Sequence, residues 1–398
     1  ERAGDEARQQ HAGGDRAVLG DRRDHAAGEP DLHGRVLGEH AVADRTELRD
    51  QALAAAGVGP AKRRADLDQR DLAVGADVRQ PIELDLRGAA LLAELVELLV
   101  VAGGGLLGLL VLLVTYTAAL FIGLIIFNLF KSWVPDVLIR ILIADVIATL
   151  FVWSVGIVFK TASIYDPYWS VQPLVILLAL MIHRGVFDLG AIVLLSLVAL
   201  WSLRLTANFI YTFSDLSYQD WRYTMLREKS GKLYFFVNLF GINLFPTLVV
   251  YACIYPMLLY VERGGSATFN LMSLIGIILA VIAILFETVA DVQMQQFRSV
   301  PENKGKIIRV GLWKYNRHPN YFGEILMWWG IYAVVLALNP SIWFVFFGAL
   351  INTLMFVIIS IPMAERRLAG YKAGFNEYRD ETWMLFPLPF AKGKRREQ

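Results

Sequence analysis

Residues 271–298 read LMSLIGIILAVIAILFETVADVQMQQFR, an apolar run that turns polar only in its last helical turns. An α-helix rises 1.5 Å per residue, so about 20 apolar residues cross the roughly 30 Å hydrocarbon core of a bilayer. The apolar stretch Phe269–Phe297 exceeds this length. It therefore predicts a membrane-spanning helix with polar groups near one end.

Seven more stretches have the length and composition of membrane spans. They are Val101–Phe130, Val137–Phe159, Tyr168–Ile182, Phe187–Phe213, Leu233–Val261, Tyr321–Leu338 and Ile342–Met363. The third is short, so we expect an all-α, polytopic integral membrane protein with seven to eight transmembrane helices. Only 19% of the residues are charged, against about 25% in a soluble domain. Cys253 is the only cysteine, which excludes an intrachain disulfide and a cysteine-based metal site.

The first 100 residues differ in composition from the rest of the chain. They carry 14 Lys and Arg against 20 Asp and Glu, a net charge of −6, whereas residues 101–398 carry 24 against 17, a net charge of +7. No aromatic residue precedes Tyr116, so we expect residues 1–88 to be disordered. Residues 1–100 are either a spurious extension of the reading frame, with the natural start near Val111–Tyr116, or a genuine soluble tail. Residues 101–390 form the membrane domain, followed by a basic tail at 391–398.

Basic residues indicate how the membrane domain is oriented. They concentrate in the predicted loops 214–232 and 298–320 and in the chain after Ala364, while the turn 339–341 has none. Two predicted spans separate each basic segment from the next, so all three fall on one side. Cytoplasmic loops are enriched in Lys and Arg. We therefore expect these loops and the C-terminus to be cytoplasmic, in the inner membrane if the protein is bacterial.

Ionisable side chains inside the spans are the first candidates for a functional site, because each is costly in lipid without a partner or a wet cavity. Glu287, Asp291 and Arg298 lie on one helix face by their spacing. An ordinary interfacial helix end is the alternative. Arg204 lies about 15 Å of helix rise from the cytoplasmic end of its span. Snorkelling does not cover that depth, so Arg204 predicts a buried anionic partner.

The densest group of polar residues is GLWKYNRHPNYFGE, residues 311–324. Pro319 suits the first turn of a helix, and Asn316 is a possible cap before it. Free backbone N–H groups at that helix start, beside cationic side chains, predict an anion site for a large cofactor. A basic loop contacting lipid headgroups is the alternative. The residues predicted to line the site are Tyr315, Arg317, His318, Asn320, Tyr321 and Glu324.

Asp166 and Tyr168 precede the short third span, in the sequence YDPYWSVQP of residues 165–173. Burial raises the pKa of a carboxyl group, so Asp166 is a candidate proton donor. A simple cap before Pro167 is the alternative. No His, Glu or Cys cluster has metal-ligand spacing, and no phosphate-binding glycine loop is present. The basic segments flank membrane spans, so nothing favours nucleic-acid binding.

The motif NRHPNYFGE at 316–324, the Trp328-Trp-Gly that follows it, and the tail segments ERRL at 365–368 and PLP at 387–389 resemble the C-terminal half of the steroid 5α-reductase superfamily. The resemblance covers roughly residues 115–390, and its closest branch is bacterial members of unknown substrate. It implies NADPH-dependent reduction of a carbon–carbon double bond conjugated to a carbonyl, in a lipophilic substrate that enters from the bilayer.

The same resemblance assigns roles to individual residues. It implies that Asn320 and Glu324 contact the nicotinamide carboxamide, and that Asp291, Arg298 and Arg204 belong to the cofactor site. Arg204 would reach the cofactor phosphate. Asp166 falls near a family Glu that binds the substrate carbonyl. The family's catalytic Tyr falls at Trp201, which has no transferable hydroxyl, so Tyr168 is the substitute proton donor.

Two other functions remain open. The motif and the ERRL segment are shared with isoprenylcysteine and phospholipid methyltransferases, which use S-adenosylmethionine. The number of spans and the pair Asp291 and Arg298 favour the reductase. A membrane protein without enzymatic activity is the second alternative, and the oligomeric state is not predicted.

Overall fold

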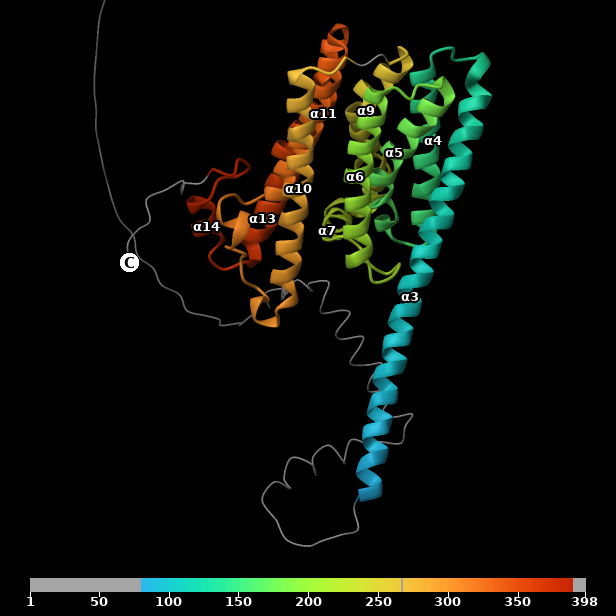
Figure 1. Cartoon of the computed structure of the whole chain (residues 1–398). Coiled ribbons are helices and arrows are strands. Elements are labelled where there is room, and N and C mark those ends of the chain that lie inside the picture. The colour runs from blue at the N-terminus through green and yellow to red at the C-terminus, as the bar shows by residue number, and fades with distance from the viewer. Residues whose placement is uncertain (1–79, 266–267, 389–398) are drawn as a thin grey trace, which may run out of the picture. The chain divides into compact units, whose positions relative to one another are not determined.

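The computed structural model describes residues 80–265 and 268–388, with side chains from residue 104 onward. These residues form an all-α protein in which eight helical stretches are long and apolar enough to cross a membrane (Figure 1). The predicted fold class is therefore confirmed, at the upper end of the predicted helix number. The sequence predicts that residues 1–100 are a separate N-terminal segment. Residues 1–79 of it lie outside the described part of the chain.

The spanning stretches are built from one or more helices each. They are α3 (Gln80–Leu129), α4 (Val137–Val158), α5 (Tyr168–Arg184) with a preceding turn at Ala162–Tyr165, α6 (Leu189–Thr212), α7 to α9 (Trp221–Ser230, Tyr234–Phe236 and Phe245–Glu262), α10 (Leu271–Ser299), α11 (Pro319–Leu338), and α12 with α13 (Phe347–Leu354 and Ile361–Tyr371). The π-helical segments Val237–Leu244 and Met355–Ser360 join α8 to α9 and α12 to α13. A last short helix, α14, covers Phe375–Glu381.

Local sequence explains where several helices begin. Asp136 and Asp188 accept backbone hydrogen bonds as N-caps of α4 and α6, and Asn270 forms a capping box with Ser273 at the start of α10. Pro319 begins α11, as predicted. The predicted cap is wrong, because the side-chain amide of Asn316 donates to the backbone of Leu385 instead.

One expectation about the N-terminal region needs correction. Helix α3 begins at Gln80, so residues 80–88, which the composition predicts not to fold, are helical. The stretch Val101–Phe130 lies almost entirely within this one long helix.

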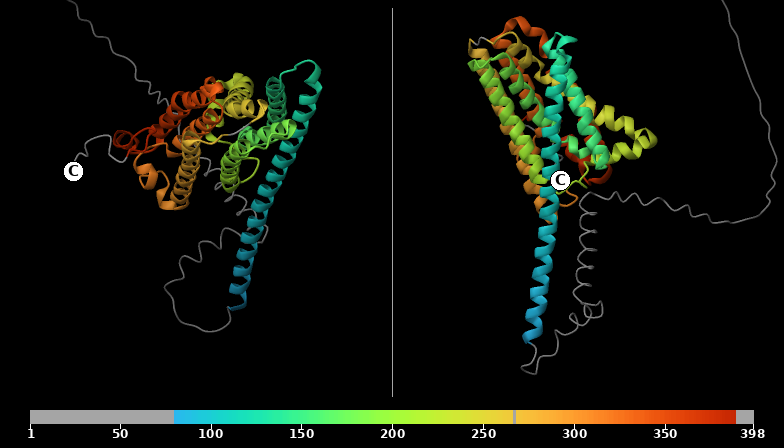
Figure 2. Two further views of the ribbon diagram at one scale, coloured as in Figure 1. Left: turned by 45° about the horizontal axis from the view of Figure 1, so that its top comes forward. Right: turned by 90° about the vertical axis from the view of Figure 1, so that its right-hand side faces the viewer.

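Helices α10 and α11 lie side by side and contact each other more extensively than any other pair (Figures 1 and 2). Small residues allow this approach, as is common between membrane helices. A Cβ added to Gly323 would lie 2.8 Å from the carbonyl oxygen of Ala283, and one added to Gly276 would lie 2.7 Å from the backbone nitrogen of Val334. The close packing brings the first turns of α11 against the polar end of α10.

The three basic segments meet at one end of the helix bundle, which we call the basic end. The guanidinium of Arg367 in α13 lies 4.3 Å from the ring centroid of Trp221 in α7. Arg309, between α10 and α11, donates to the carbonyl oxygen of Gly374 at 3.1 Å. These contacts join the loop after α6, the loop after α10 and the C-terminal segment, as the alternation of basic and non-basic loops predicts.

Candidate functional site

A buried ion cluster joins α6 to α10. Arg204 donates to the Oδ2 atom of Asp291 at 2.7 Å, and its second terminal nitrogen lies 2.5 Å from Oε1 of Glu287. The side chains of Arg204, Glu287 and Asp291 are 11%, 6% and 18% exposed. The spacing 287/291 puts both carboxylates on one face of α10, one turn apart. The structure therefore supplies the buried anionic partner that the depth of Arg204 predicts.

The polar contacts continue along both helices toward the basic end. Gln295, one turn after Asp291, donates to Asn208, which lies one turn after Arg204. On the other side of the cluster, the side-chain amide of Asn320 in α11 lies 3.5 Å from Oδ1 of Asp291. Three helices thus contribute to one continuous polar network.

Glu324 lies one turn beyond Asn320 and is 5% exposed. Two indole groups donate to its carboxylate: Nε1 of Trp201 in α6 at 2.8 Å and Nε1 of Trp328 in α11 at 2.7 Å. The two tryptophan rings pack edge to face, with centroids 5.0 Å apart. Charge-assisted hydrogen bonds of this kind fix the orientation of the carboxylate. Trp201 therefore holds Glu324 in place rather than transferring a proton.

The network contains more anionic than cationic groups. Arg204 stands among the carboxylates of Glu287, Asp291 and Glu324. Nε of Arg204 and Oε2 of Glu287 are buried without a hydrogen-bond partner in the described part of the chain. Buried polar atoms without partners are rare and costly in folded proteins. The network can therefore donate one further hydrogen bond to a ligand, from Nε of Arg204, and accept one, at Oε2 of Glu287, and it favours neutral amide or cationic groups over anions.

Arg317 and His318 belong to a second cluster, which fastens the C-terminal segment to the loop before α11. Arg317 donates to Glu365 at 2.7 Å and to the carbonyl oxygens of Arg379 at 2.8 Å and Thr382 at 2.5 Å. Nε2 of His318 lies 3.1 Å from the same oxygen of Glu365. These bonds join Glu365 and the C-terminal segment to the loop before α11, so the cluster is a structural clamp.

Burial lowers the pKa of His318, and the nearby Glu365 opposes this shift without cancelling it. The unfolded chain, with a histidine pKa of about 6.5, then binds more protons below that pH than the folded chain does. Stability is expected to fall as the pH drops from 7 to 5. The variant His318→Gln should show a smaller drop in its thermal unfolding midpoint over this interval. The exposed His183, changed to Gln, is the control, and equal pH dependence of both variants would contradict the prediction.

Asp166 and Tyr168 lie in a third group, away from the carboxylates of the network. The hydroxyl of Tyr223 in α7 donates to Asp166. Tyr168 is 6% exposed and packs against Tyr116 and Tyr165. The cap alternative is not realised, since Pro167 is the N-cap residue of α5 and no side chain caps that helix. One aromatic contact leads toward the network: the ring centroid of Trp169 lies 5.8 Å from that of Trp201.

The remaining predicted residues lie at the edges of these groups. Arg298 is exposed in the last turn of α10, and Tyr315 is 38% exposed. Tyr321 stacks on His318, with ring centroids 5.3 Å apart. The structure therefore brings Arg204, Asp291, Asn320 and Glu324 together and leaves Arg298 outside.

The structure adds contacts that the sequence does not predict. The sequence names Glu287 only as an ionisable residue on the face of Asp291, and the structure makes it a partner of Arg204. The resemblance includes Trp201, Trp328 and Glu365 but gives none of them a binding role, and an indole in an apolar helix is usually a packing residue. Only the spatial contact identifies Trp201 and Trp328 as partners of Glu324 and Glu365 as the partner of Arg317.

Fold and site together define a polytopic α-helical membrane protein with a polar centre inside its bundle. The chain belongs to the family described as protein of unknown function (DUF1295), which matches residues 152–382. The matched interval contains every residue of the network. An uncharacterized protein of Schizosaccharomyces pombe is 22% identical over 260 residues, which cover 59% of this chain and 75% of the relative. No solved structure matches the chain.

Proposed function

We propose that this protein is a membrane-embedded oxidoreductase that uses NADPH to reduce a conjugated carbon–carbon double bond in a lipophilic substrate. The observation that carries the proposal is one buried network near the basic end, in which Arg204 pairs with Glu287 and Asp291 and the amide of Asn320 contacts Asp291. The relation of the DUF1295 family to steroid 5α-reductase-like proteins supports it.

The network fits the nicotinamide end of such a cofactor. A carboxamide has one acceptor oxygen and two donor hydrogens, which match the amide of Asn320 and the carboxylates of Asp291 and Glu324. Oε2 of Glu287 and Nε of Arg204 are buried and without hydrogen-bond partners among the described residues. These groups would hold the carboxamide and fix the face that the ring presents.

The phosphates fit a different set of residues from the one the resemblance implies. Arg204 is paired with two carboxylates and Arg317 with Glu365 and backbone carbonyls, so neither is available to an anion. Arg298 is exposed one helical turn beyond Gln295, at the basic end. We therefore assign phosphate binding to Arg298 and the exposed cations around it, where Lys and Arg attract anions from solution.

The residues of this chain contribute orientation, exclusion of water and proton supply. The bound cofactor supplies the hydride. A hydrogen-bond donor at the substrate carbonyl stabilises the negative charge that develops on its oxygen. Asp166 and Tyr168 remain the proposed donors. The aromatic rings around Tyr168 adjoin the polar network through the contact between Trp169 and Trp201. A flat apolar substrate would bind along these rings.

A methyltransferase using S-adenosylmethionine is the second candidate, and one observation favours it. Two carboxylates pair with Arg204 and a third, Glu324, belongs to the same network, so the excess of negative charge would suit a sulfonium cation. We place it second because the amide of Asn320 has no evident role toward a sulfonium.

Titration of the purified protein in detergent with NADPH and with S-adenosylmethionine separates the two. We expect saturable binding of NADPH, weakened about tenfold in Asn320→Ala, since a lost hydrogen bond of about 1.4 kcal/mol corresponds to that factor. Asn352→Ala is the matched control, because Asn352 is buried in α12 outside the network. Saturable binding of S-adenosylmethionine alone would overturn the reductase proposal.

A further inference from the structure

A second group of buried polar side chains lies inside the bundle, between α4 and α5. On α4, Asp145 and Thr149 lie one turn apart on the same face. On α5, Tyr168 and Gln172 are spaced in the same way. The side-chain amide of Gln172 donates to Oδ2 of Asp145 and joins the two helices. Asp145 and Gln172 are 4% and 5% exposed, so both are buried among membrane-spanning helices.

The hydroxyl groups of this region use their protons among themselves. The hydroxyl of Tyr165 lies 2.7 Å from Oγ1 of Thr247, which in turn lies 3.2 Å from Oγ1 of Thr149. Thr247 donates its own proton to the carbonyl oxygen of Asn243 at 2.9 Å. A hydroxyl has one proton to donate and two lone pairs, so Thr247 accepts from both neighbours. These three hydroxyls therefore have no proton left for Asp145.

Two acceptor oxygens of the group are left without a donor. Oδ1 of Asp145 and Oε1 of Gln172 are buried and have no hydrogen-bond partner among the described residues. One hydrogen bond joins their side chains, so the two oxygens lie close together. Buried polar atoms without partners are rare in folded proteins, and each calls for an explanation. What this pair lacks is a group with N–H or O–H donors.

Asp145 also lacks a positively charged partner. Among the described residues, no Lys, Arg or His forms an ion pair with it. Arg140 is the one basic residue of α4, and its guanidinium lies over the ring of Phe127 in α3, 4.6 Å from the centroid. Five residues turn the helix by about 140°, so Arg140 and Asp145 point in different directions. An ionisable group inside a membrane protein is costly without a partner.

Aromatic rings stand beside the acceptor pair. Tyr168, one turn before Gln172, packs against Tyr116 of α3 and against Tyr165. The ring centroids are 5.5 and 5.8 Å apart, and the ring planes are tilted by 59° and 48°. The face of a tyrosine ring attracts a cation within about 6 Å of its centroid. A carboxylate beside such rings suits an ammonium group.

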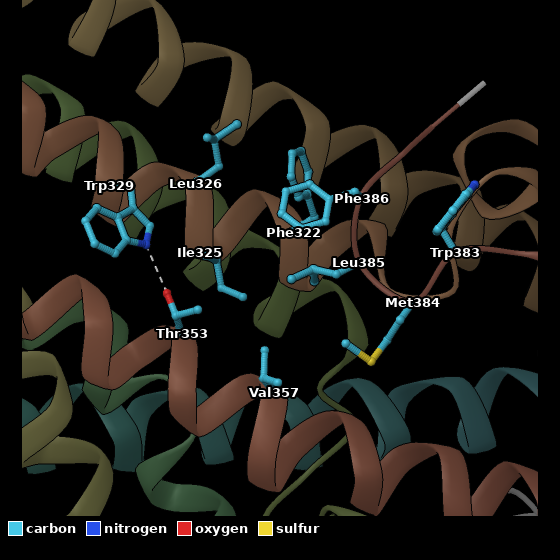
Figure 3. A pocket seen from close by; sticks show the side chains of 10 residues that line it. All are labelled: Phe322, Ile325, Leu326, Trp329, Thr353, Val357, Trp383, Met384, Leu385 and Phe386. Carbon is cyan, nitrogen blue, oxygen red and sulfur yellow. Dashed lines mark hydrogen bonds between the residues drawn. The ribbon is translucent and has the colours of Figure 1, made fainter. Parts of the chain in front are cut away.

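A cavity of about 480 Å³ between α11, the π-helical segment Met355–Ser360 and the C-terminal chain offers different chemistry (Figure 3). Its lining side chains are apolar apart from Thr353 and two indoles, and Nε1 of Trp329 donates to Thr353 at 3.0 Å. No acidic side chain is among its described lining residues. This cavity can hold hydrocarbon but has no group that recognises an amine, so it distinguishes the two kinds of binding.

We propose that Asp145 and Gln172 bind the protonated primary amine of a lipophilic molecule. Its positive charge pairs with the Asp145 carboxylate, and its N–H groups donate to the two oxygens that lack partners. The apolar part lies along the ring of Tyr168 and its aromatic neighbours. That such an amine is the substrate of the reductase rests on the proposed function, whereas the binding of the amine does not.

Equilibrium binding of tritiated phenylbutylamine to the full chain in phosphatidylcholine nanodiscs, without NADPH, tests the proposal. We expect saturable binding that is weakened about tenfold in Asp145→Asn, which keeps the shape of the side chain and removes its charge. Two matched competitors separate charge from hydrogen bonding. Phenylbutanol has a donor but no charge, and phenylbutyltrimethylammonium has the charge but no N–H group. Both should compete about tenfold less well than the amine.

Two control variants locate the bound amine. Val357→Phe fills the apolar cavity of Figure 3, and Glu324→Gln removes a carboxylate of the Arg204 network. Neither change should alter the affinity for phenylbutylamine. A loss of binding confined to either control would place the amine in the cavity or in the network and overturn the site.

The remaining outcomes are also decisive. Equal affinity of the unaltered chain and Asp145→Asn overturns the role of the carboxylate. Equal competition by the amine and its two analogues overturns amine recognition, and this arm needs no variant to fold. Because NADPH is titrated separately, loss of the amine site leaves the cofactor proposal standing, and failure to bind NADPH leaves the amine site standing.

Discussion

Replacing Arg204 with methionine is expected to lower the free energy of unfolding by about 3–5 kcal/mol, the cost of removing one partner of a buried ion pair. The physical reason is that Glu287 and Asp291 would then lie inside the membrane-spanning bundle without their cation. Methionine keeps an unbranched side chain, so the change tests charge more than packing. The thermal unfolding midpoint of the purified protein in detergent measures the effect.

Two comparisons make this result specific to the network. Arg184→Met breaks a comparable pair with Glu262, but Arg184 is 37% exposed, and such pairs contribute only about 0–1 kcal/mol. The triple variant Arg204→Met, Glu287→Gln, Asp291→Asn removes all three charges and should recover much of the loss, because no buried charge is left unpaired. A triple variant as unstable as Arg204→Met would show that the charges are not the cause.

Replacing Gly330 with alanine is expected to destabilise the α10–α11 pair by about 1–3 kcal/mol, the usual cost of overpacking. The added Cβ would lie 2.7 Å from the backbone nitrogen of Ala280 and 3.0 Å from the carbonyl oxygen of Gly276. Neither atom belongs to a flexible side chain, so the two helices must move apart. The measurement is again the unfolding midpoint in detergent.

Gly370→Ala provides the matched control in α13. No atom lies within 4 Å of a Cβ built at Gly370, so alanine should be neutral or stabilising by up to about 1 kcal/mol through its higher helix propensity. Equal midpoints for Gly330→Ala and Gly370→Ala would contradict the close packing. Because the α10–α11 contact also positions Asn320 against Asp291, Gly330→Ala should also weaken the NADPH binding that we propose.

Much of the candidate site follows from sequence spacing. The i, i+4 relation identifies Glu287 with Asp291 and Asn320 with Glu324 as pairs on one helix face, because helix geometry fixes which neighbours share a face. The depth of Arg204 in its span indicates a buried acidic partner, because an unpaired charge is costly there. Which acid it meets does not follow from either rule.

For Arg317 and His318, sequence position does not predict the contacts that the structure shows. Their position at a helix start, with cationic character, predicts an anion site, yet the structure commits both to Glu365. The partner comes from α13, 48 residues away from Arg317. No local sequence pattern distinguishes a cation that is free to bind a ligand from one that is hydrogen-bonded to a distant segment of the chain.

The sequence by itself determined the class of protein, the number of spans to within one, and the end of the bundle where basic residues gather. These properties depend on the length of apolar runs relative to the bilayer and on loop charge, both of which are local. The tertiary structure alone decided which polar groups meet. Trp201 reaches Glu324 across 123 residues, and that contact requires a particular rotation of α6 against α11. Helix rotation is set by the packing of whole faces, such as the small residues between α10 and α11, and no single residue encodes it.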